Sequence, residues 1–425
     1  MALADTDRLG RPVIVVTGMG VVTSLGIGRE ANWRALTAGR SGIRRITRFP
    51  IGGLRTTVAG TVDTVPLDEP SAPALSERMA ELVIEEAMAE AGIGRAGDFP
   101  GPLFVAMPPV ELEWTQRRAI ADATGTQAVT YADLLRVANT GAFARFQSRF
   151  LFGSVADHLA ERFGTKGSPI ATSTACASGA TAIQLAVEAI RRGECEAALA
   201  VGTDASVNAE SLIRFSLLSA LSTRNDPPES AARPFSKDRD GFVMAEGAGA
   251  LVLESLAHAR ARGATVLGVV AGSGEQTDSF HRTRSSPDGK PIIACMRNAL
   301  ADAGVAPEEI GYINAHGTGT PENDKMECLG VAAVFGERAS TVPISSNKSM
   351  IGHTLSAAGA VEAIFTVLAV RHGVLPPTIN YETPDPALPV DCVPNVAREA
   401  RVRYAMSSSF GFGGQNVCLV IGAAD

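Results

Sequence analysis

Cys176, His316 and His353 are the side chains of this sequence that are placed most suggestively for covalent chemistry. Cys176 lies in a run of small residues that leads into a helical pattern. Each of the two histidines follows an apolar run that is typical of a buried strand, and each has a glycine beside it. A cysteine thiolate attacks carbonyl carbon readily, and imidazoles accept or donate protons near neutral pH. These residue types therefore predict nucleophilic catalysis, provided that the fold brings them together.

Cys176 is expected on a turn between a strand at Ile170–Thr174 and a helix at Ala177–Arg192. The helix has one apolar face, and its sequence ends on two arginines and Gly193, which is typical of a helix C-terminus. A sulfur at the positive end of this helix would be favoured as thiolate, and the first amides of the helix can hold an oxyanion. From the local sequence alone, a small buried structural cysteine is an equally good interpretation.

His316 and His353 each follow a predicted strand, and the carboxyl ends of strands in open α/β sheets face the binding crevice. A lone histidine more often has a structural role. Two histidines and a cysteine at equivalent strand ends instead favour a common site.

Polar and aromatic residues flank these positions. Lys348 lies five residues before His353 and is either a solvated surface lysine or a group that holds this ring neutral and oriented. Thr318 and Thr320 offer hydroxyls to a polar ligand arm. The segment 410–414 combines two aromatics with three glycines, which predicts a loop that moves or lies against a ligand.

Strand-like and helical patterns alternate along the chain and predict a mixed sheet with helices on both faces. The first strand is expected at Val13–Thr17, ended by Gly18 and Gly20, and a boundary near residue 264 divides the pattern into two halves. The further expected elements are strands at Leu103–Met107, Ala197–Gly202, Leu251–Glu254, Val266–Val270, Tyr312–Ala315, Val342–Ser345, Tyr404–Ser408 and Asn416–Ile421, and helices at Ala31–Ala38, Ser76–Ala91, Pro291–Ala303 and Gly359–Arg371.

The chain of 425 residues has a formal net charge of −7, which argues against nucleic acid as the main partner. No apolar stretch is expected to reach the roughly 18 residues of a membrane span, and the N-terminus lacks a signal-peptide pattern, so we expect a cytoplasmic protein. The six cysteines are scattered without a C-x-x-C pair. This spacing predicts neither a disulfide framework nor a metal site.

Taken together, these segments resemble the elongating β-ketoacyl-[acyl-carrier-protein] synthases. The resemblance covers nearly the whole chain and implies a thiolase-like α/β fold, with two similar halves, 1–264 and 265–425, packed as a layered α-β-α-β-α body. The matching stretches are VTGMGVVTSLG, TACASGA, LSTRNDPPESAARPFSKDRDGFVMAEGAGALVLE, INAHGTGTPEND, SSNKSMIGHTLSAAGAVEAI, PPTINYETPDP and SSSFGFGGQN.

The resemblance implies that Cys176 takes the acyl chain from an acyl carrier protein, with the oxyanion held by the amides of Cys176 and Phe412. Malonyl carrier protein then loses carbon dioxide, His316 and His353 donate hydrogen bonds to the enolate, and the new carbanion attacks the acyl-cysteine.

Further roles follow from the same resemblance. Lys348 would support the second histidine, and Thr318 and Thr320 would contact the phosphopantetheine arm. Phe412, with its neighbours Phe410 and Gly411, would gate acyl entry. Glu362 resembles a buried acid behind the site. No cofactor is expected on the enzyme, because the carrier protein brings the phosphopantetheine, and a homodimer is implied.

Three functions are compared on this basis: an elongating enzyme of fatty-acid or specialised lipid synthesis, a free-standing polyketide ketosynthase, and a non-elongating partner subunit. The intact Cys-His-His set disfavours the last of these. It also disfavours the initiating branch, which has an asparagine where His353 stands.

Two departures from the family pattern are visible. The stretch from Ala106 to Trp114 replaces a glycine-rich turn, and the sequence that follows, to about Arg149, is longer than usual and rich in phenylalanine. We expect an acyl pocket of altered length or shape, with a surface elaboration as the alternative.

The second departure concerns the basic residues that usually meet the acidic carrier protein. Of the three usual places, the early helix offers only Arg78, and the other two hold Gly141 and Ser219. Docking is therefore expected to be weaker or to shift to Arg145 and Arg149, with a specialised carrier protein as the partner.

Overall fold

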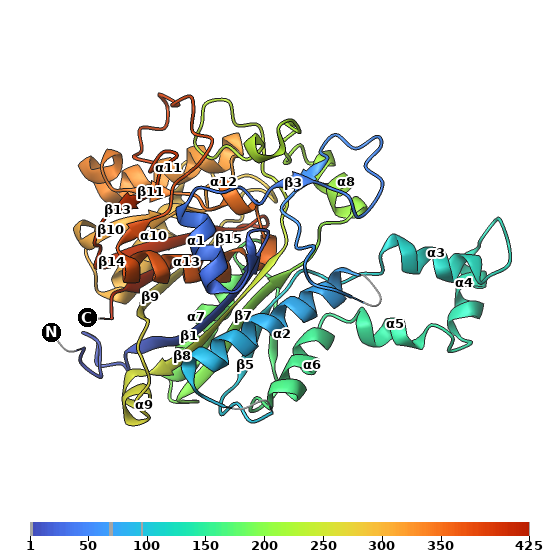
Figure 1. Cartoon of the computed structure of the whole chain (residues 1–425), viewed down its shortest axis with the longest axis horizontal. Coiled ribbons are helices and arrows are strands. Elements are labelled where there is room, and N and C mark those ends of the chain that lie inside the picture. The colour runs from blue at the N-terminus through green and yellow to red at the C-terminus, as the bar shows by residue number, and fades with distance from the viewer. Residues whose placement is uncertain (1–2, 68–70, 95–96, 425) are drawn as a thin grey trace.

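One mixed β-sheet runs through the computed structural model, which describes residues 3–67, 71–94 and 97–424 (Figure 1). β1 and β9 join its two halves through three antiparallel residue pairs, from Ile14 with Val270 to Val16 with Gly268. From edge to edge the strands are β11 (Ile344–Ser345), β10 (Ile310–Asn314), β14 (Tyr404–Phe410), β15 (Gln415–Gly422), β9 (Gly268–Thr277), β1 (Ile14–Thr23), β8 (Gly247–Ser255), β7 (Ala197–Asp204), β5 (Leu103–Ala106) and β6 (Ile170–Thr172).

The two halves have the same topology. In the N-terminal half the spatial order is β6-β5-β7-β8-β1, and in the C-terminal half it is β11-β10-β14-β15-β9. Numbered within each half, both orders are 3-2-4-5-1, and in both the first two neighbouring pairs are parallel and the last two antiparallel. The expectation of two similar α/β halves is confirmed. The expected boundary at residue 264 falls between α9 (Leu256–Ala261) and β9 and stays a prediction.

Three layers of helices cover the two half-sheets. Helices α7 (Ser178–Arg191) and α13 (Ala358–His372) lie between the halves and share one apolar core with both. Helix α2 (Ala72–Ala91) covers the outer face of the N-terminal half, and α10 (Lys290–Ala303) and α11 (Pro321–Phe335) cover the C-terminal half. The expected α-β-α-β-α layering follows from this arrangement.

Glycines allow the outer helices to approach the first strand of each half. A Cβ on Gly18 or Gly20 would lie 2.0 or 2.1 Å from a carbonyl oxygen of α2, and one on Gly272 or Gly274 would lie 2.4 or 2.2 Å from a backbone nitrogen of α10. The expectation that Gly18 and Gly20 end the first strand was wrong. β1 continues through them to Thr23, because each residue from Gly18 to Thr23 pairs with a residue of antiparallel β8. The two glycines carry no side chain on the face that α2 covers, which lets that helix approach the strand.

The central layer is packed equally closely. A Cβ on Gly179 of α7 would lie 2.4 Å from the nitrogen of Ala360, and one on Gly359 of α13 would lie 2.3 Å from the nitrogen of Ala180. These contacts bring the N-terminal ends of α7 and α13 together, which is where the chain carries Cys176 and His353.

The stretch Leu355–His372 is long and apolar enough to cross a membrane by length and composition. The expectation that no apolar stretch reaches the length of a membrane span was wrong. This stretch is 89% buried inside the molecule, so packing between the two half-sheets accounts for its apolar character.

The long segment after β5 forms an arm that projects from the body (Figure 1). Its helices are α3 (Trp114–Asp122), α4 (Tyr131–Ala138) and α5 (Ala144–Arg149), after which α6 (Ser154–Phe163) returns to the sheet. Phe146 packs between Phe143 and Phe150, with ring centroids 5.4 and 6.1 Å away. The arm is thus ordered by its own short helices and contains the expected phenylalanine cluster.

Candidate active site

Cys176 lies on a strained turn between β6 and α7. Ala175 before it has a φ of 49°, a left-handed conformation that costs a non-glycine residue about 1 kcal/mol or more. Ser178 stabilises the turn, because its hydroxyl donates to the Ala175 carbonyl at 2.6 Å and accepts from the Thr174 N–H at 2.7 Å. The turn presents the sulfur to a cavity between the two halves.

The thiol of Cys176 has some accessible surface because it lines this cavity, but it lies deep below the outer surface. Burial raises the pKa of Cys176 to about 11, although the backbone N–H of Phe412 is directed at the sulfur and lowers the pKa in part. This direction opposes the expected preference for thiolate, because burial disfavours the charged form. α7 begins only at Ser178, two residues after Cys176.

His316 follows β10, and two backbone hydrogen bonds fix its position. Glu327 of α11 accepts the N–H of His316 at 2.8 Å and that of Gly317 at 2.7 Å. Burial raises the pKa of Glu327 to about 7. Glu327 was not among the residues predicted from the sequence. The available signal was a carboxylate on the buried face of a helix that starts just after the histidine loop.

His353 follows β11 and the single turn of α12 (Lys348–Ile351). Its Nδ1 accepts the Leu355 N–H at 3.2 Å, so the proton of the neutral ring is on Nε2, which becomes a hydrogen-bond donor. Burial and nearby Lys348 lower the pKa of His353 well below its usual range.

Lys348 is fully buried and contacts the first histidine, whereas the sequence analysis expected it to support His353. Its Nζ lies 3.4 Å from Nδ1 of His316 and donates to the His316 carbonyl at 2.6 Å. The third partner is the carboxylate of Glu362 on α13, whose pKa burial raises to about 7. An ammonium beside Nδ1 makes this nitrogen an acceptor, so His316 also carries its proton on Nε2. Burial and Lys348 lower the pKa of His316 well below its usual range.

The fold brings Cys176, His316 and His353 into one cluster. The sulfur and one ring nitrogen of each histidine all lie within 4.8 Å of one another. The two imidazoles meet edge to face, with centroids 5.3 Å apart at 83°. Two neutral N–H donors beside a thiol suit a reaction in which negative charge develops on a substrate oxygen.

A sulfur and two imidazoles are also a donor set that zinc uses, so the wide sequence spacing does not by itself exclude a metal. The ammonium of Lys348 next to His316 places a positive charge in the same site, which opposes a second cation.

The turn between β14 and β15 lies against the nucleophile. It is closed by the Gly411 N–H to the Gln415 carbonyl at 2.7 Å, and a Cβ on Gly411 would lie 2.8 Å from the Thr174 carbonyl and 3.3 Å from the Cys176 nitrogen. Gly414 has a φ of 88° and approaches the Asp278 carbonyl. Glycines are required here because backbone meets backbone, and this contact directs the Phe412 amide at Cys176.

Two cavities meet at Phe412. One of about 360 Å³ contains Cys176, and the other, of about 470 Å³, reaches Phe410, Gly411 and Thr320. Phe412 and Leu218 line both cavities, so Phe412 separates them. The Thr318 hydroxyl lies 2.9 Å from that of Thr320, which also caps α11.

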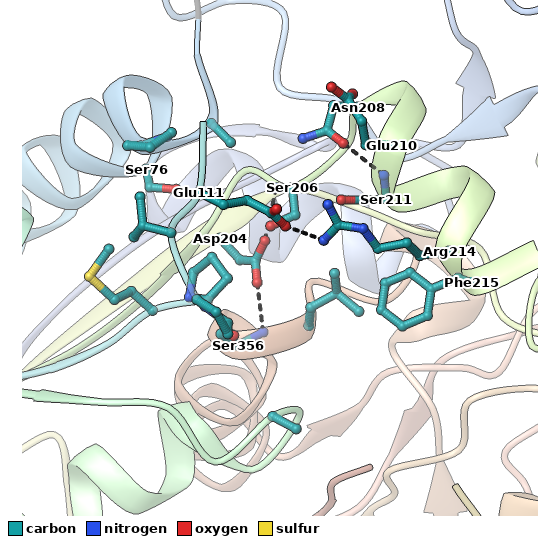
Figure 2. Close-up of a pocket in the computed structure, with 18 of the residues that line it drawn as sticks. Ser76, Glu111, Asp204, Ser206, Asn208, Glu210, Ser211, Arg214, Phe215 and Ser356 are labelled. Carbon is teal, nitrogen blue, oxygen red and sulfur yellow. Dashed lines mark hydrogen bonds and ion pairs between the residues drawn. The ribbon is translucent and has the colours of Figure 1, made fainter. Parts of the chain in front are cut away.

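The cavity beside Cys176 extends to the divergent turn (Figure 2). Residues 107–113 of this turn form one wall, and Phe215, Leu218 and Leu355 add apolar surface. Polar groups also line the cavity: buried Asp204 accepts the N–H groups of Ser206 at 2.9 Å and Ser356 at 3.0 Å, and Arg214 of α8 (Ala209–Leu217) pairs with Glu111 of the turn. The divergent turn therefore shapes the cavity next to the nucleophile.

Family models match most of the chain: the Beta-ketoacyl synthase, N-terminal domain, over residues 11–259, and the Beta-ketoacyl synthase, C-terminal domain, over residues 267–382. The chain is 38% identical over 420 residues to 3-oxoacyl-[acyl-carrier-protein] synthase 2 of Coxiella burnetii, covering 96% of this chain and 98% of that protein. It is 37% identical over 416 residues to the tetracenomycin polyketide synthase ketoacyl synthase alpha subunit of Streptomyces glaucescens, covering 94% and 95%.

Solved structures agree. A ketosynthase in complex with a type II polyketide acyl-carrier protein is 32% identical, with a TM-score of 0.84, and the match covers 97% of this chain and 100% of that one. A beta-ketoacyl synthase from Burkholderia phymatum is 34% identical, with a TM-score of 0.81, covering 97% and 99%. With the thiol and two imidazoles in one buried cluster, these matches show that the chain belongs to the β-ketoacyl synthase family, the condensing enzymes of thiolase-like fold.

Proposed function

We propose that the protein elongates acyl chains as a 3-oxoacyl-[acyl-carrier-protein] synthase, by decarboxylative condensation of an acyl group on Cys176 with malonyl carrier protein. The observation that carries this proposal is the cluster of one thiol and two neutral imidazoles within 4.8 Å, whose thiol lines a cavity that Phe412 separates from a second one. The reaction needs a nucleophile that forms and leaves a thioester easily and hydrogen-bond donors for an enolate.

In the first half-reaction, the Cys176 sulfur attacks the acyl thioester. The amides of Cys176 and Phe412 stabilise the oxyanion, and the bond from the carbonyl carbon to the pantetheine sulfur breaks. The proton of the Cys176 thiol ends on the leaving pantetheine sulfur. Because its pKa is raised, the thiol keeps this proton until the thioester is bound, so loss of the proton has to accompany the attack.

In the second half-reaction, the bond between the malonyl carboxylate and the α-carbon breaks, and carbon dioxide leaves. The electron pair passes to the thioester oxygen, where Nε2–H groups of His316 and His353 donate to the enolate. The α-carbon then attacks the acyl carbonyl and displaces the Cys176 thiolate, which takes a proton from solvent. Lys348 and Glu362 act as positioning residues behind His316.

The cavity beyond Phe412 suits the pantetheine arm of the carrier protein. Thr320 lines this cavity, and its hydroxyl lies 2.9 Å from that of buried Thr318 behind it. A change of the Phe412 rotamer would open the route to Cys176. The enzyme itself needs no cofactor in this scheme. We further propose a cytoplasmic homodimer.

The test uses acyl carrier proteins of graded chain length with malonyl carrier protein, and mass spectrometry of the products. We expect 3-oxoacyl products two carbons longer, none with Cys176→Ala, and a malonyl decarboxylation rate about 10²–10³ lower with His316→Ala. His158→Ala, which changes an exposed side chain on α6, serves as the matched control. Absence of product at every chain length, or wild-type decarboxylation by His316→Ala, would contradict the proposal.

A second candidate, a polyketide ketosynthase, is favoured by the polar wall of the acyl cavity (Figure 2). Ser76 of α2 lines this cavity, is 1% exposed, and has a hydroxyl without a hydrogen-bond partner in the described part of the chain. A buried hydroxyl left unpaired costs about 1–3 kcal/mol, which an oxygen on the acyl chain would recover. A plain saturated chain offers no such group.

The two candidates are separated by loading Cys176 with saturated and oxygen-bearing acyl chains of equal length and by following the intact mass. If the polyketide function is correct, wild type prefers the oxygen-bearing chain and Ser76→Ala loses much of that preference. Ser154→Ala, buried on α6 away from the cavity, is the control. Equal loading of both chains by wild type would favour the saturated substrates of fatty-acid synthesis.

A further inference from the structure

The entrance cavity beyond Phe412 has an unusually basic rim. It is formed by the loop 278–289 and by the first turn of α11, and Arg282, Arg284 and Lys325 line it together with His281. All four side chains are exposed. The rim therefore faces whatever molecule brings the thioester to the active site.

These cations are free to meet a partner. Within residues 3–67, 71–94 and 97–424, the side chains of Arg282, Arg284 and Lys325 have no ion pair and no hydrogen bond. Two acidic residues line the same cavity. Asp278 is buried, and its carboxylate is occupied by the N–H groups of Phe280 at 3.0 Å and Ser286 at 2.7 Å; Glu322 is the only exposed acid among the described lining residues. The balance of charge at the entrance is positive.

The rim is attached to the gating turn by its backbone. Gly413 donates its N–H to the Arg282 carbonyl at 2.8 Å, and Asp278 donates its N–H to the Gly414 carbonyl at 2.7 Å. Phe412 lies directly before Gly413. The loop with the cations is therefore held at a fixed distance from the residue that separates the two cavities.

Apolar side chains accompany the charges. Phe280, in the same loop, is 56% exposed, and Leu217, next to the shared residue Leu218, is 81% exposed. A basic rim around exposed apolar residues is typical of a protein-docking surface, in which charges orient the partner and apolar contacts hold it.

From these observations we propose that Arg282, Arg284 and Lys325 form the docking surface for an acidic acyl carrier protein, an assignment that rests on the proposed function. The occupant follows from charge and position. The whole chain has a net charge of −7, so an acidic partner approaches against the long-range field and depends on a local positive patch. The patch surrounds the entrance through which the partner's thioester must pass.

This docking surface differs from the one expected from the sequence, which used Arg145 and Arg149. Arg149 on the arm is already paired with Glu77 at 2.6 Å, and the guanidinium of Arg145 lies over the Phe146 ring at 5.2 Å. Neither residue lines the entrance cavity.

The experiment compares Arg282→Glu/Arg284→Glu with wild type on two substrates, an acyl carrier protein and the same acyl group on free pantetheine. We expect KM for the protein substrate to rise about tenfold or more, and its dependence on salt to flatten, while the effect on the pantetheine thioester is several-fold smaller. Lys325→Glu should add to the effect. Arg260→Glu, a surface arginine on α9 paired with Asp5, is the control for net charge and should change neither KM.

Binding of holo carrier protein to the Cys176→Ala enzyme, followed by calorimetry, tests docking without turnover. An unchanged Kd in the double variant would overturn the proposal, as would an equal loss on both substrates or an equal effect of Arg260→Glu. If wild type turned over neither substrate but bound the carrier protein through these residues, the proposed function would fail and the docking surface would stand.

Discussion

Burial lowers the pKa values of His316 and His353 and so favours their uncharged form. Both rings lie between the half-sheets, and both have Nδ1 facing a donor: the Leu355 amide for His353 and the Lys348 ammonium for His316. A protonated ring would carry a charge that is buried away from water, and it would also be repelled by the ammonium of Lys348. The site therefore presents two neutral Nε2–H donors over a wide range of pH.

The lowered pKa values predict the acid limb of malonyl decarboxylation. As pH falls, a histidine of ordinary pKa would take up a proton near pH 6.5, but here protonation of His316 and His353 is displaced to lower pH. Protonation of His316 and His353 should therefore cause no loss of decarboxylation by the Cys176→Ala enzyme near pH 6.5, and any change near pH 7 would come from Glu327 or Glu362 and should be absent when these residues are replaced by glutamine. A loss of rate centred near pH 6.5 that persists in the glutamine variants, measured by release of carbon dioxide, would contradict this expectation.

Lys348 provides a second test at the same scale. In Lys348→Met the positive charge next to both rings is removed, so the pKa values of His316 and His353 should rise towards the usual range. We expect the acid limb of decarboxylation to move to higher pH, in addition to a lower plateau from loss of positioning. An unshifted acid limb would show that burial alone sets the two pKa values.

At the scale of elements, the crossing of α7 and α13 determines where the site forms. The two helices approach through Gly179 and Gly359, each packed against the backbone of the other helix. Cys176 immediately precedes α7, and His353 lies five residues before α13. A wider crossing would therefore move the nucleophile away from the enolate donors.

This packing predicts the effect of adding one methyl group. Gly179→Ala or Gly359→Ala should lower the free energy of unfolding by about 1–3 kcal/mol, because the helices must separate, and condensation should fall as well. Urea denaturation followed by circular dichroism measures the first effect. Gly52→Ala is the control, since its Cβ would meet nothing within 4 Å and the change should be close to neutral. Equal stability of Gly179→Ala and Gly52→Ala would contradict the expectation.

At the scale of the whole molecule, one chain leaves apolar surface uncovered. Tyr131 is 76% exposed on the arm, Leu151 follows at 52%, and Ile170 on β6 is 45% exposed. β6 pairs only with β5 among the described strands, so its other edge is open. Open strand edges and exposed apolar residues favour assembly with another chain.

The expected homodimer can be tested through this surface. Ile170→Asp and Tyr131→Asp should shift the protein from dimer towards monomer, because each places a charge in apolar surface that a second copy would bury. Size-exclusion chromatography with light scattering reads the mass directly, and Leu9→Asp, a lone exposed leucine near the N-terminus, should leave it unchanged. A wild-type monomer, or variants that remain dimeric, would contradict this interface.

Most elements of the fold were predictable from the sequence, because their burial is local. The apolar face of α7 and the apolar runs of β5, β7 and β10 belong to elements that are buried along most of their length. A short stretch of sequence is therefore enough to identify them. Predictions failed where glycines pack against a distant helix. The G-x-G segments of β1 and β9 resemble strand ends in the sequence. In the structure both strands continue through them, and the glycines allow the outer helices α2 and α10 to pack closely against the sheet.

Cys176, His316 and His353 could be identified as candidates from the sequence, because each lies in a short segment whose residue types suit a strand-end turn, and the structure brings the three together. Which of them touch was decided by the tertiary structure. Lys348 lies near His353 in sequence but contacts His316, and Glu327 and Glu362 reach the site only through α11 and α13. The raised pKa of Cys176 and the free cations at the entrance depend on burial and on partners far along the chain, which short-range patterns do not contain.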